Sequence, residues 1–285
     1  MTKIKLEKIN YIYSAGTPFQ NHALRDVDLE IEEGSITGII GHTGSGKSTL
    51  MKLLNGLEKP HSGCVLLDGV DIWEKPKEIT KIRFRVGLVM QYPEYQLFEE
   101  TVERDIAFGP RNMGLSDSEI AVRVKETAAI VGLSPELLGK SPFDLSGGEK
   151  RRAAIAGVMA MRPEVLVLDE PAAGLDPVGR ETIFNAVIDY RKATGGTVII
   201  VSHSMEDMAR ICDYIAVMSQ GRLFMSGTTS EVFSAADKLT STGLDIPEVS
   251  KLMLALKDAG ADIRDIPYTV DAAQQMLLSL LKSRK

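Results

Sequence analysis

The chain has 285 residues, of which 44% are hydrophobic and 25% are charged. These fractions resemble those of ordinary globular proteins and exclude a disordered, collagen-like or disulfide-scaffold chain. The net charge of -6 argues against nucleic acid as the main partner, because polyanion binding relies on clustered positive charge. The length itself predicts one large domain or two modest ones.

Residues 3–40 alternate in short strand-like pieces, which predict an antiparallel β layer that leads into one buried strand. Residues 50–57 and 119–131 have the apolar spacing of helices. Residues 165–168 and 198–201 are continuous apolar runs rich in β-branched residues, as in strands covered on both faces. We therefore predict an α/β fold with a parallel-sheet core.

The domain organisation follows from the breaks in this pattern. Residues 93–160 are mostly helical and interrupted by glycine and proline, which predicts a helical subdomain inserted into the core. We predict one domain over residues 1–228 and a helical C-terminal extension over residues 229–285. In the extension, apolar residues fall on one helix face after Pro247 and again after Pro267. These two amphipathic helices either pack on the chain's own core or contact another protein.

The cysteines and the start of the chain bear on location. Cys64 and Cys212 lie far apart without metal-ligand spacing, which predicts inert thiols in a reducing compartment. The charged start, MTKIKLEK, lacks the apolar stretch of a secretory signal. No window approaches the roughly 18 to 20 apolar residues that span a bilayer. We therefore expect a protein that is neither exported nor membrane-spanning.

A glycine-rich loop follows the apolar strand predicted at residues 36–40, and a helical segment follows the loop. This strand-loop-helix context, with the pattern G-x-x-x-x-G-K-S, predicts a phosphate-binding loop for ATP with Mg²⁺. The glycines let backbone N–H groups point at phosphate oxygens, Lys47 reaches the β- and γ-phosphates, and the Ser48 hydroxyl ligates Mg²⁺. The predicted nucleotide-binding residues here are Gly41, His42, Thr43, Gly44, Ser45, Gly46, Lys47, Ser48 and Thr49.

Two acids close the buried strand predicted at residues 165–168. Asp169 is placed to hold the Mg²⁺ that Ser48 also touches. Glu170 is then free to orient and polarise a water molecule that attacks the γ-phosphate. The pair therefore predicts hydrolysis of ATP to ADP and phosphate rather than tight storage of the nucleotide.

A second glycine-containing turn opens the helical run that begins at residue 150, and it is a second potential anion site. A single nucleotide needs one phosphate loop, so this turn is expected to face a nucleotide held by another subunit. The turn consists of Ser146, Gly147, Gly148 and Glu149. In this arrangement the chain resembles ABC-type ATPases over about residues 3–230.

The resemblance implies further site residues. The resemblance implies that Tyr13 stacks on adenine, although the neighbouring Tyr11 is a second aromatic residue of the same strand. Gln91 would sense Mg²⁺ and contact a membrane subunit, Asp176 would lie in the loop between subunits, and His203 would hydrogen-bond the γ-phosphate. The predicted catalytic residues are Lys47, Gln91, Glu170 and His203, and the predicted metal ligands are Ser48, Gln91 and Asp169.

Two positions depart from the commonest pattern of this family. Glu149 stands where glutamine is usual, which keeps the side-chain length and adds a negative charge near the helix start. Ala172 stands where many cassettes have serine or threonine, which removes one hydroxyl from the expected dimer interface. We expect activity to survive both changes, because neither removes a predicted catalytic group.

Within the family, the sequence is most similar to the ATP-binding subunits of energy-coupling factor transporters, which import vitamins and transition metals. The resemblance lies in residues 11–19, 91–98 and 152–158, and residues 17–19 and 150–152 look most like the second ATPase type. It implies a heterodimer with a sister ATPase, a membrane-embedded coupling subunit and a substrate-binding membrane component. It also implies a peripheral position at the cytoplasmic face of the cell membrane.

Other functions compete with this interpretation. The chain could serve another ABC transporter, since the distinction depends on the three segments named above. A soluble ABC ATPase acting on DNA or ribosomes usually has two cassettes, a long coiled coil or a basic surface, whereas this chain has one cassette and is acidic. A small-molecule kinase with a phosphate loop would leave Ser146 and His203 without a role.

Overall fold

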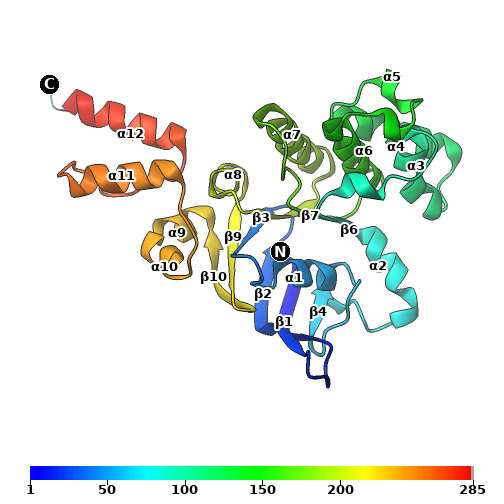
Figure 1. The fold of residues 1–285 in the computed structure, drawn as a ribbon, viewed down its shortest axis with the longest axis horizontal. Coiled ribbons are helices and arrows are strands. Elements are labelled where there is room, and N and C mark those ends of the chain that lie inside the picture. Colours follow the sequence, from blue (N-terminus) through cyan, green and yellow to red (C-terminus); the bar gives the residue numbers. More distant parts are fainter. Residues whose placement is uncertain (284–285) are drawn as a thin grey trace.

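Two sheets organise the chain (Figure 1), and the computed structural model describes residues 1–283. Residues 284 and 285, the end of the predicted extension, lie outside the described residues. One sheet is antiparallel, in the order β2-β1-β4-β5. Its strands are β1 (Thr2–Tyr13), β2 (Asn21–Glu32), β4 (Ser62–Leu67) and β5 (Val70–Asp71).

The second sheet has the order β10-β9-β3-β8-β7-β6 and is parallel except for the pairing of β9 with β10. Its strands are β3 (Ile36–Ile40), β6 (Val86–Val89), β7 (Val165–Asp169), β8 (Thr197–Val201), β9 (Tyr214–Ser219) and β10 (Arg222–Thr228). The predicted α/β fold with an antiparallel layer and a parallel core is therefore confirmed.

Helices cover the parallel sheet, make up most of residues 93–160 and continue after residue 228. In the first part of the chain they are α1 (Lys47–Leu54), η1 (Pro76–Glu78), α2 (Ile79–Arg85), η2 (Pro93–Gln96), α3 (Val102–Asn112), α4 (Asp117–Ile130), α5 (Pro135–Leu138), η3 (Pro142–Asp144) and α6 (Gly147–Met159). In the second part they are α7 (Pro177–Thr194), α8 (Met205–Ile211), α9 (Thr229–Ser234), α10 (Ala236–Ser241), α11 (Glu248–Asp258) and α12 (Val270–Ser283). Among residues 1–283, no helix has both the length and the apolar character needed to cross a membrane.

The parallel strands are apolar throughout because both faces of their sheet are covered. Every residue of β3, β7 and β8 is buried. On one face, Leu166 and Ile200 pack in a core with the helices α3, α4, α6, α7 and α8. On the other face, Val167 and Ile199 pack against α1 and the antiparallel sheet. The sheet is therefore the middle layer of the molecule.

The middle layer brings the predicted site residues to one edge. The neighbouring strands β3, β8, β7 and β6 are parallel, so their carboxyl ends meet at the same side of the sheet. The phosphate loop follows β3, His203 follows β8, Asp169 ends β7, Glu170 follows it, and Gln91 follows β6. Residues separated by more than a hundred positions in sequence are thereby placed side by side.

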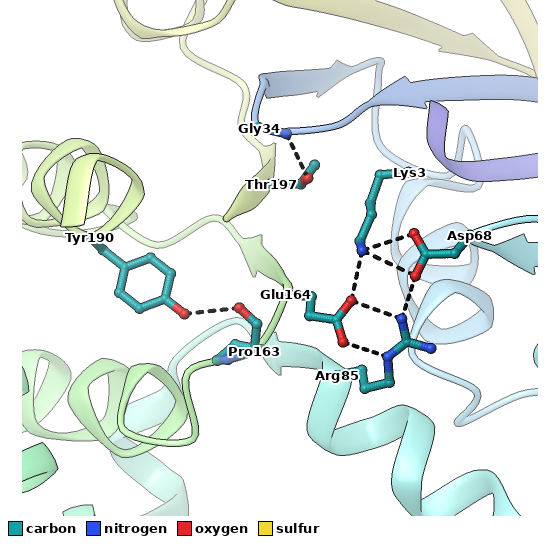
Figure 2. A network of polar contacts seen from close by, with 8 residues as sticks. All are labelled: Lys3, Gly34, Asp68, Arg85, Pro163, Glu164, Tyr190 and Thr197. Atoms are coloured by element: carbon teal, nitrogen blue, oxygen red, sulfur yellow. Dashed lines mark hydrogen bonds and ion pairs between the residues drawn. The ribbon is translucent and has the colours of Figure 1, made fainter. Parts of the chain in front are cut away.

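At the opposite ends of β6 and β7, a network of charged side chains joins the two sheets (Figure 2). The Lys3 ammonium of β1 lies 2.7 Å from the Glu164 carboxylate and 2.9 Å from Asp68, which follows β4. Arg85 donates from Nε to Glu164 at 2.6 Å and also pairs with Asp68. Because Arg85 and Glu164 directly precede β6 and β7, the network fixes where these two strands begin.

This network predicts how acid affects stability. Hydrogen bonds from Arg85 are the main reason that the pKa of Glu164 falls from its ordinary value of 4.5 to about 2. A depressed pKa contributes stability above pH 4.5 that is lost as the pH falls toward 2. We expect Glu164→Gln to lower the free energy of unfolding near neutral pH by about 1 kcal/mol, after solvent screening of these partly exposed groups.

Urea unfolding of the wild type and of Glu164→Gln, at about pH 7 and about pH 3, checks this expectation. The gap between the two proteins should be largest at the higher pH and should narrow at the lower one. A gap that stays constant across this range would contradict the assignment.

The C-terminal helices divide into two groups. Val232 and Phe233 of α9 and Leu239 of α10 are buried in the main core, next to the sheet. By contrast, α11 and α12 lie together at one end of the molecule (Figure 1) and share a small core that includes Met253 and Ala273. The ring of Tyr268, just before α12, stacks on Phe233 of α9 with 6.0 Å between the ring centroids. This contact joins α11 and α12 to the main core.

Candidate nucleotide site

A cavity of about 760 Å³ lies at the carboxyl ends of β3, β6, β7 and β8. Its volume is in the range of small-molecule sites. It brings together the following residues that the sequence analysis selected: Tyr13, Thr43, Gly44, Gly46, Lys47, Ser48, Thr49, Gln91, Asp169, Glu170 and His203. The predicted metal ligands, the predicted catalytic residues and part of the predicted glycine loop therefore surround one space, whereas Gly41, His42 and Ser45 do not line it.

The phosphate loop is held in shape by its own backbone and by a neighbouring turn. Gly46 has φ of 103°, in the left-handed region, and a Cβ at this position would lie 2.6 Å from the Ala23 carbonyl oxygen. The loop also contacts the turn between β9 and β10, because the Gly221 amide donates to the Ser45 carbonyl at 3.1 Å. The amide of Arg25 in β2 donates in turn to the Gly221 carbonyl at 2.7 Å.

Lys47 carries the positive charge of this loop. Its ammonium donates to the carbonyl oxygens of Gly41, at 2.6 Å, and His42, at 3.0 Å. Only 6% of the residue is exposed, and burial lowers the Lys47 pKa, while the carboxylates of Glu170 and Asp169 act in the opposite direction. A phosphate group is the chemistry that this buried cation and the glycine backbone fit.

The oxygen atoms needed for Mg²⁺ lie beside Lys47. The Ser48 hydroxyl hydrogen-bonds the Asp169 carboxylate, although burial dominates and raises the Asp169 pKa. A hydroxyl, a carboxylate and the amide oxygen of Gln91 are the hard oxygen ligands that Mg²⁺ prefers, together with phosphate oxygens and water. These residues therefore fit Mg²⁺ bound with ATP, and the ion would neutralise charge on the phosphates.

Glu170 and His203 form a close pair in the same cavity. The Nε2 atom of His203 lies 2.9 Å from Oε1 of Glu170, whose side chain is 9% exposed. Burial, and next the charge of Asp169, raise the Glu170 pKa to about 7. Burial and the nearby Lys47 lower the pKa of His203. A carboxyl group with a pKa near neutrality is suited to accept a proton from water.

The backbone supports this role for Glu170. Its φ is 47°, a conformation that L-residues seldom adopt, and its amide donates to the Val201 carbonyl at 2.9 Å. Such strain persists only where the surroundings impose it, and it is concentrated at functional sites. The strain therefore agrees with a site built around the Glu170 side chain.

Tyr13 lines the same cavity. Its hydroxyl is 3.1 Å from the Thr49 hydroxyl, and its ring meets Tyr11 edge-on at 4.9 Å. Tyr11 itself is buried and donates to Glu58 at 2.6 Å, so its ring does not line the cavity. Of the two tyrosines, Tyr11 and Tyr13, only the ring of Tyr13 lines the cavity, where an adenine base could stack on it.

The second glycine turn lies away from this cavity. Ser146, Gly147, Gly148 and Asp176 line a separate hollow of about 510 Å³ between α6 and α7. Within one chain the turn and the phosphate loop therefore do not enclose the same space. This separation is what an arrangement with a second subunit requires.

The structure gives Glu149 and Asp176 local roles that the sequence analysis missed. Glu149 accepts hydrogen bonds from the Ser146 amide at 2.8 Å and the Ser146 hydroxyl at 2.6 Å, completing a capping box at the start of α6. The spacing Ser-x-x-Glu was a sufficient signal for this cap. Asp176 accepts from the Gly179 amide at 2.7 Å and caps α7.

Other cavity residues were also missed. Asn21, His22 and Arg25 come from β2, and Gln220 and Gly221 come from the turn between β9 and β10. The Gln-Gly pair was a readable turn signal, but its position beside the phosphate loop depends on contacts far apart in sequence.

Comparisons with known proteins agree with this geometry. The pattern of the family described as "ABC transporter" matches residues 24–173. The chain is 52% identical over 283 residues to the energy-coupling factor transporter ATP-binding protein EcfA2 of Clostridium acetobutylicum, with 99% of each chain covered. It is 51% identical over 282 residues to the protein of the same name in Clostridium tetani, covering 99% of this chain and 98% of the other.

Solved structures of ABC-type ATPases are also similar to this chain. The cbiO1 protein of Clostridium perfringens, part of the ABC transporter complex cbiONQ, has a TM-score of 0.76 and 39% identity, covering 91% of this chain and 97% of that chain. A dimeric ATP-binding cassette in a post-hydrolysis state, bound to ADP and Pi, has a TM-score of 0.71 and 29% identity, covering 79% of this chain and 98% of its own. With the phosphate loop, the paired acids and the second glycine turn in place, the chain belongs to the ABC transporter family of ATP-hydrolysing subunits.

Proposed function

We propose that this chain is the ATP-hydrolysing subunit of an energy-coupling factor importer, which powers uptake of vitamins or metal ions through membrane partners. The observation that carries the proposal is the full-length identity of 52% to a protein named for this role. The cassette bound to ADP and Pi covers only 79% of this chain, whereas the two energy-coupling factor relatives named above each cover 99% of it. The similarity to those relatives therefore extends through the C-terminal extension.

The chemistry is transfer of the γ-phosphoryl group to water. Lys47 and the loop amides bind the phosphates, while Ser48, Asp169 and Gln91 would hold Mg²⁺. When bound, Mg²⁺ neutralises charge that develops on the phosphate oxygens. Glu170 takes a proton from the attacking water, and His203, whose Nε2 atom lies 2.9 Å from the Glu170 carboxylate, would hydrogen-bond the γ-phosphate.

We propose that two such subunits hold two ATP molecules between them. The turn at Ser146 and Gly147 presents backbone N–H groups at the start of α6, and it would meet the nucleotide of the sister ATPase. The exposed aromatic residues Tyr95 and Phe98, which follow Gln91, offer a surface for the membrane-embedded coupling subunit. The subunit would then sit peripherally at the cytoplasmic face of the membrane, with substrate choice made by a separate membrane component.

The test is recovery of the tagged chain from its native membrane in mild detergent, followed by identification of the proteins that accompany it. A sister ATPase together with a multi-span membrane protein would support the proposal. Recovery of ribosomes or DNA, or of no membrane protein, would contradict the transport role and leave the ATPase chemistry intact.

We also propose that α11 and α12 contact the sister subunit. Leu252 of α11 is 55% exposed and Leu278 of α12 is 49% exposed, whereas Met253 is buried in the small core of these helices. Leu252→Glu is therefore expected to weaken subunit association by about tenfold or more, because a charge would have to be desolvated at the contact. ATP binding should be unchanged.

Analytical ultracentrifugation of the purified subunits measures this association. Lys257→Glu, at an exposed polar position of the same helix, is the matched control and should associate like the wild type. Normal association of Leu252→Glu would remove this role for the extension.

A further inference from the structure

Two short segments connect the nucleotide cavity with the hollow at the second glycine turn. In the first segment, Gln91 lines the nucleotide cavity and Glu94 lines the hollow. In the second, Glu170 lines the cavity and Asp176 lines the hollow. Each segment therefore joins the two spaces over a few residues.

The side chain of Arg151 binds both segments at once. Arg151 lies on α6, five positions after Ser146, and its side chain is 4% exposed. Its guanidinium donates to both oxygens of Glu94, at 2.9 Å and 2.5 Å, and also to the carbonyl oxygen of Ala173. The Tyr92 ring lies 5.5 Å from the guanidinium carbon, at a distance typical of a cation–π contact.

The chemistry of this contact requires arginine. Burial alone would raise the Glu94 pKa, but hydrogen bonds from Arg151 lower it below its ordinary value, so the pair is ionised at neutral pH. The planar fork of arginine can bind a carboxylate with two N–H groups and still direct a third to the Ala173 carbonyl. Lysine has a single ammonium and cannot span the same three oxygens.

We propose that Arg151 is a positioning residue for ATP hydrolysis. It holds the segments of Gln91 and Glu170 in a fixed relation to the second glycine turn, so that the two faces of the composite nucleotide sites move as one unit. The inference rests on the proposed function, because the second glycine turn acts on a nucleotide only when a partner subunit supplies one.

Hydrolysis by the detergent-solubilised transporter, with Mg·ATP as the probe, tests the proposal. We expect Arg151→Met to lower kcat by about 10- to 100-fold, as a small misplacement of catalytic groups does. The affinity for ATP of the phosphate loop should stay within about twofold, because Arg151 does not line that cavity. Arg151→Lys should recover part of kcat, because it returns a cation to Glu94 without the fork.

A second variant separates positioning from stability. Arg151→Met leaves the buried charge of Glu94 unpaired, which destabilises the fold. Adding Glu94→Gln removes that charge, so the double variant should regain thermal stability, and it remains a folded test if Arg151→Met alone does not fold. Under our proposal its kcat stays low, because the connection between the segments is still missing. Recovery of kcat along with stability would overturn the proposal.

Arg85→Met is the matched control. Arg85 also pairs with acids between segments, but at the far ends of β6 and β7 (Figure 2). This variant should lose stability and keep kcat within about twofold, because it breaks a partly exposed pair outside the site. Wild-type kcat in Arg151→Met would overturn the positioning role alone. A wild-type complex that hydrolyses no ATP would instead refute the proposed function.

Discussion

Glu170→Gln is expected to slow ATP hydrolysis by about 10²- to 10⁴-fold, the range typical for loss of a general base. The substitution is nearly isosteric, so the cavity keeps its shape and the side chain can still contact His203. It removes the carboxylate that would accept the proton from water. It also removes a negative charge beside Asp169, where phosphate binds, so ATP affinity should be equal to or higher than that of the wild type.

Single-turnover hydrolysis, with enzyme in excess over Mg·ATP and quenched before product release, measures the chemical step, and binding of a fluorescent ATP analogue measures affinity. Glu181→Gln is the matched control, since Glu181 lies on α7 with a side chain that is 59% exposed. It should hydrolyse ATP at the wild-type rate. If Glu170→Gln released phosphate at a rate near that of the wild type, another group would have to activate the water.

The main elements of the fold could be predicted from sequence because their signals are local. The apolar runs of β7 and β8 are short and β-branched, and only strands buried on both faces tolerate such runs. The glycine loop could also be predicted from sequence. The backbone at Gly46, between a strand and a helix, has a positive φ that glycine readily adopts. The family fold of such a loop then places Asp169 and His203 at the ends of neighbouring strands.

Contacts between distant segments could not be predicted in this way. The position of Gly221 against Ser45 depends on the pairing of β9 with β3, which no local pattern specifies. The binding of Arg151 to Glu94 joins residues 57 positions apart, and each looks like an ordinary surface charge in the sequence. Burial determines their role, since a charged pair inside a protein must satisfy its hydrogen bonds locally.

Residues proposed to bind the nucleotide and residues that position the binding loops have different functions in this chain. The residues that we propose for nucleotide binding lie in loops at strand ends, where side chains can change without disturbing the sheet. Residues that hold those loops in place, such as Arg151 and Gly221, come from other elements. They contact the loops and fix their positions without contacting the nucleotide in our proposal. A sequence motif therefore identifies the chemistry, while the structure identifies the residues that keep it aligned.

Lys47→Met is expected to weaken Mg·ATP binding by about 10²- to 10³-fold, because it removes charge-assisted hydrogen bonds to two phosphate groups. Methionine fills a similar volume, and the change leaves the carbonyl oxygens of Gly41 and His42 without their donor. Titration calorimetry with Mg·ATP measures the affinity, and a thermal melt without nucleotide measures the separate cost to stability. Lys77→Met, at an exposed position of η1, should bind ATP normally. Retention of tight binding by Lys47→Met would place the phosphates away from this loop and would remove the basis for the assigned roles of Ser48 and Glu170.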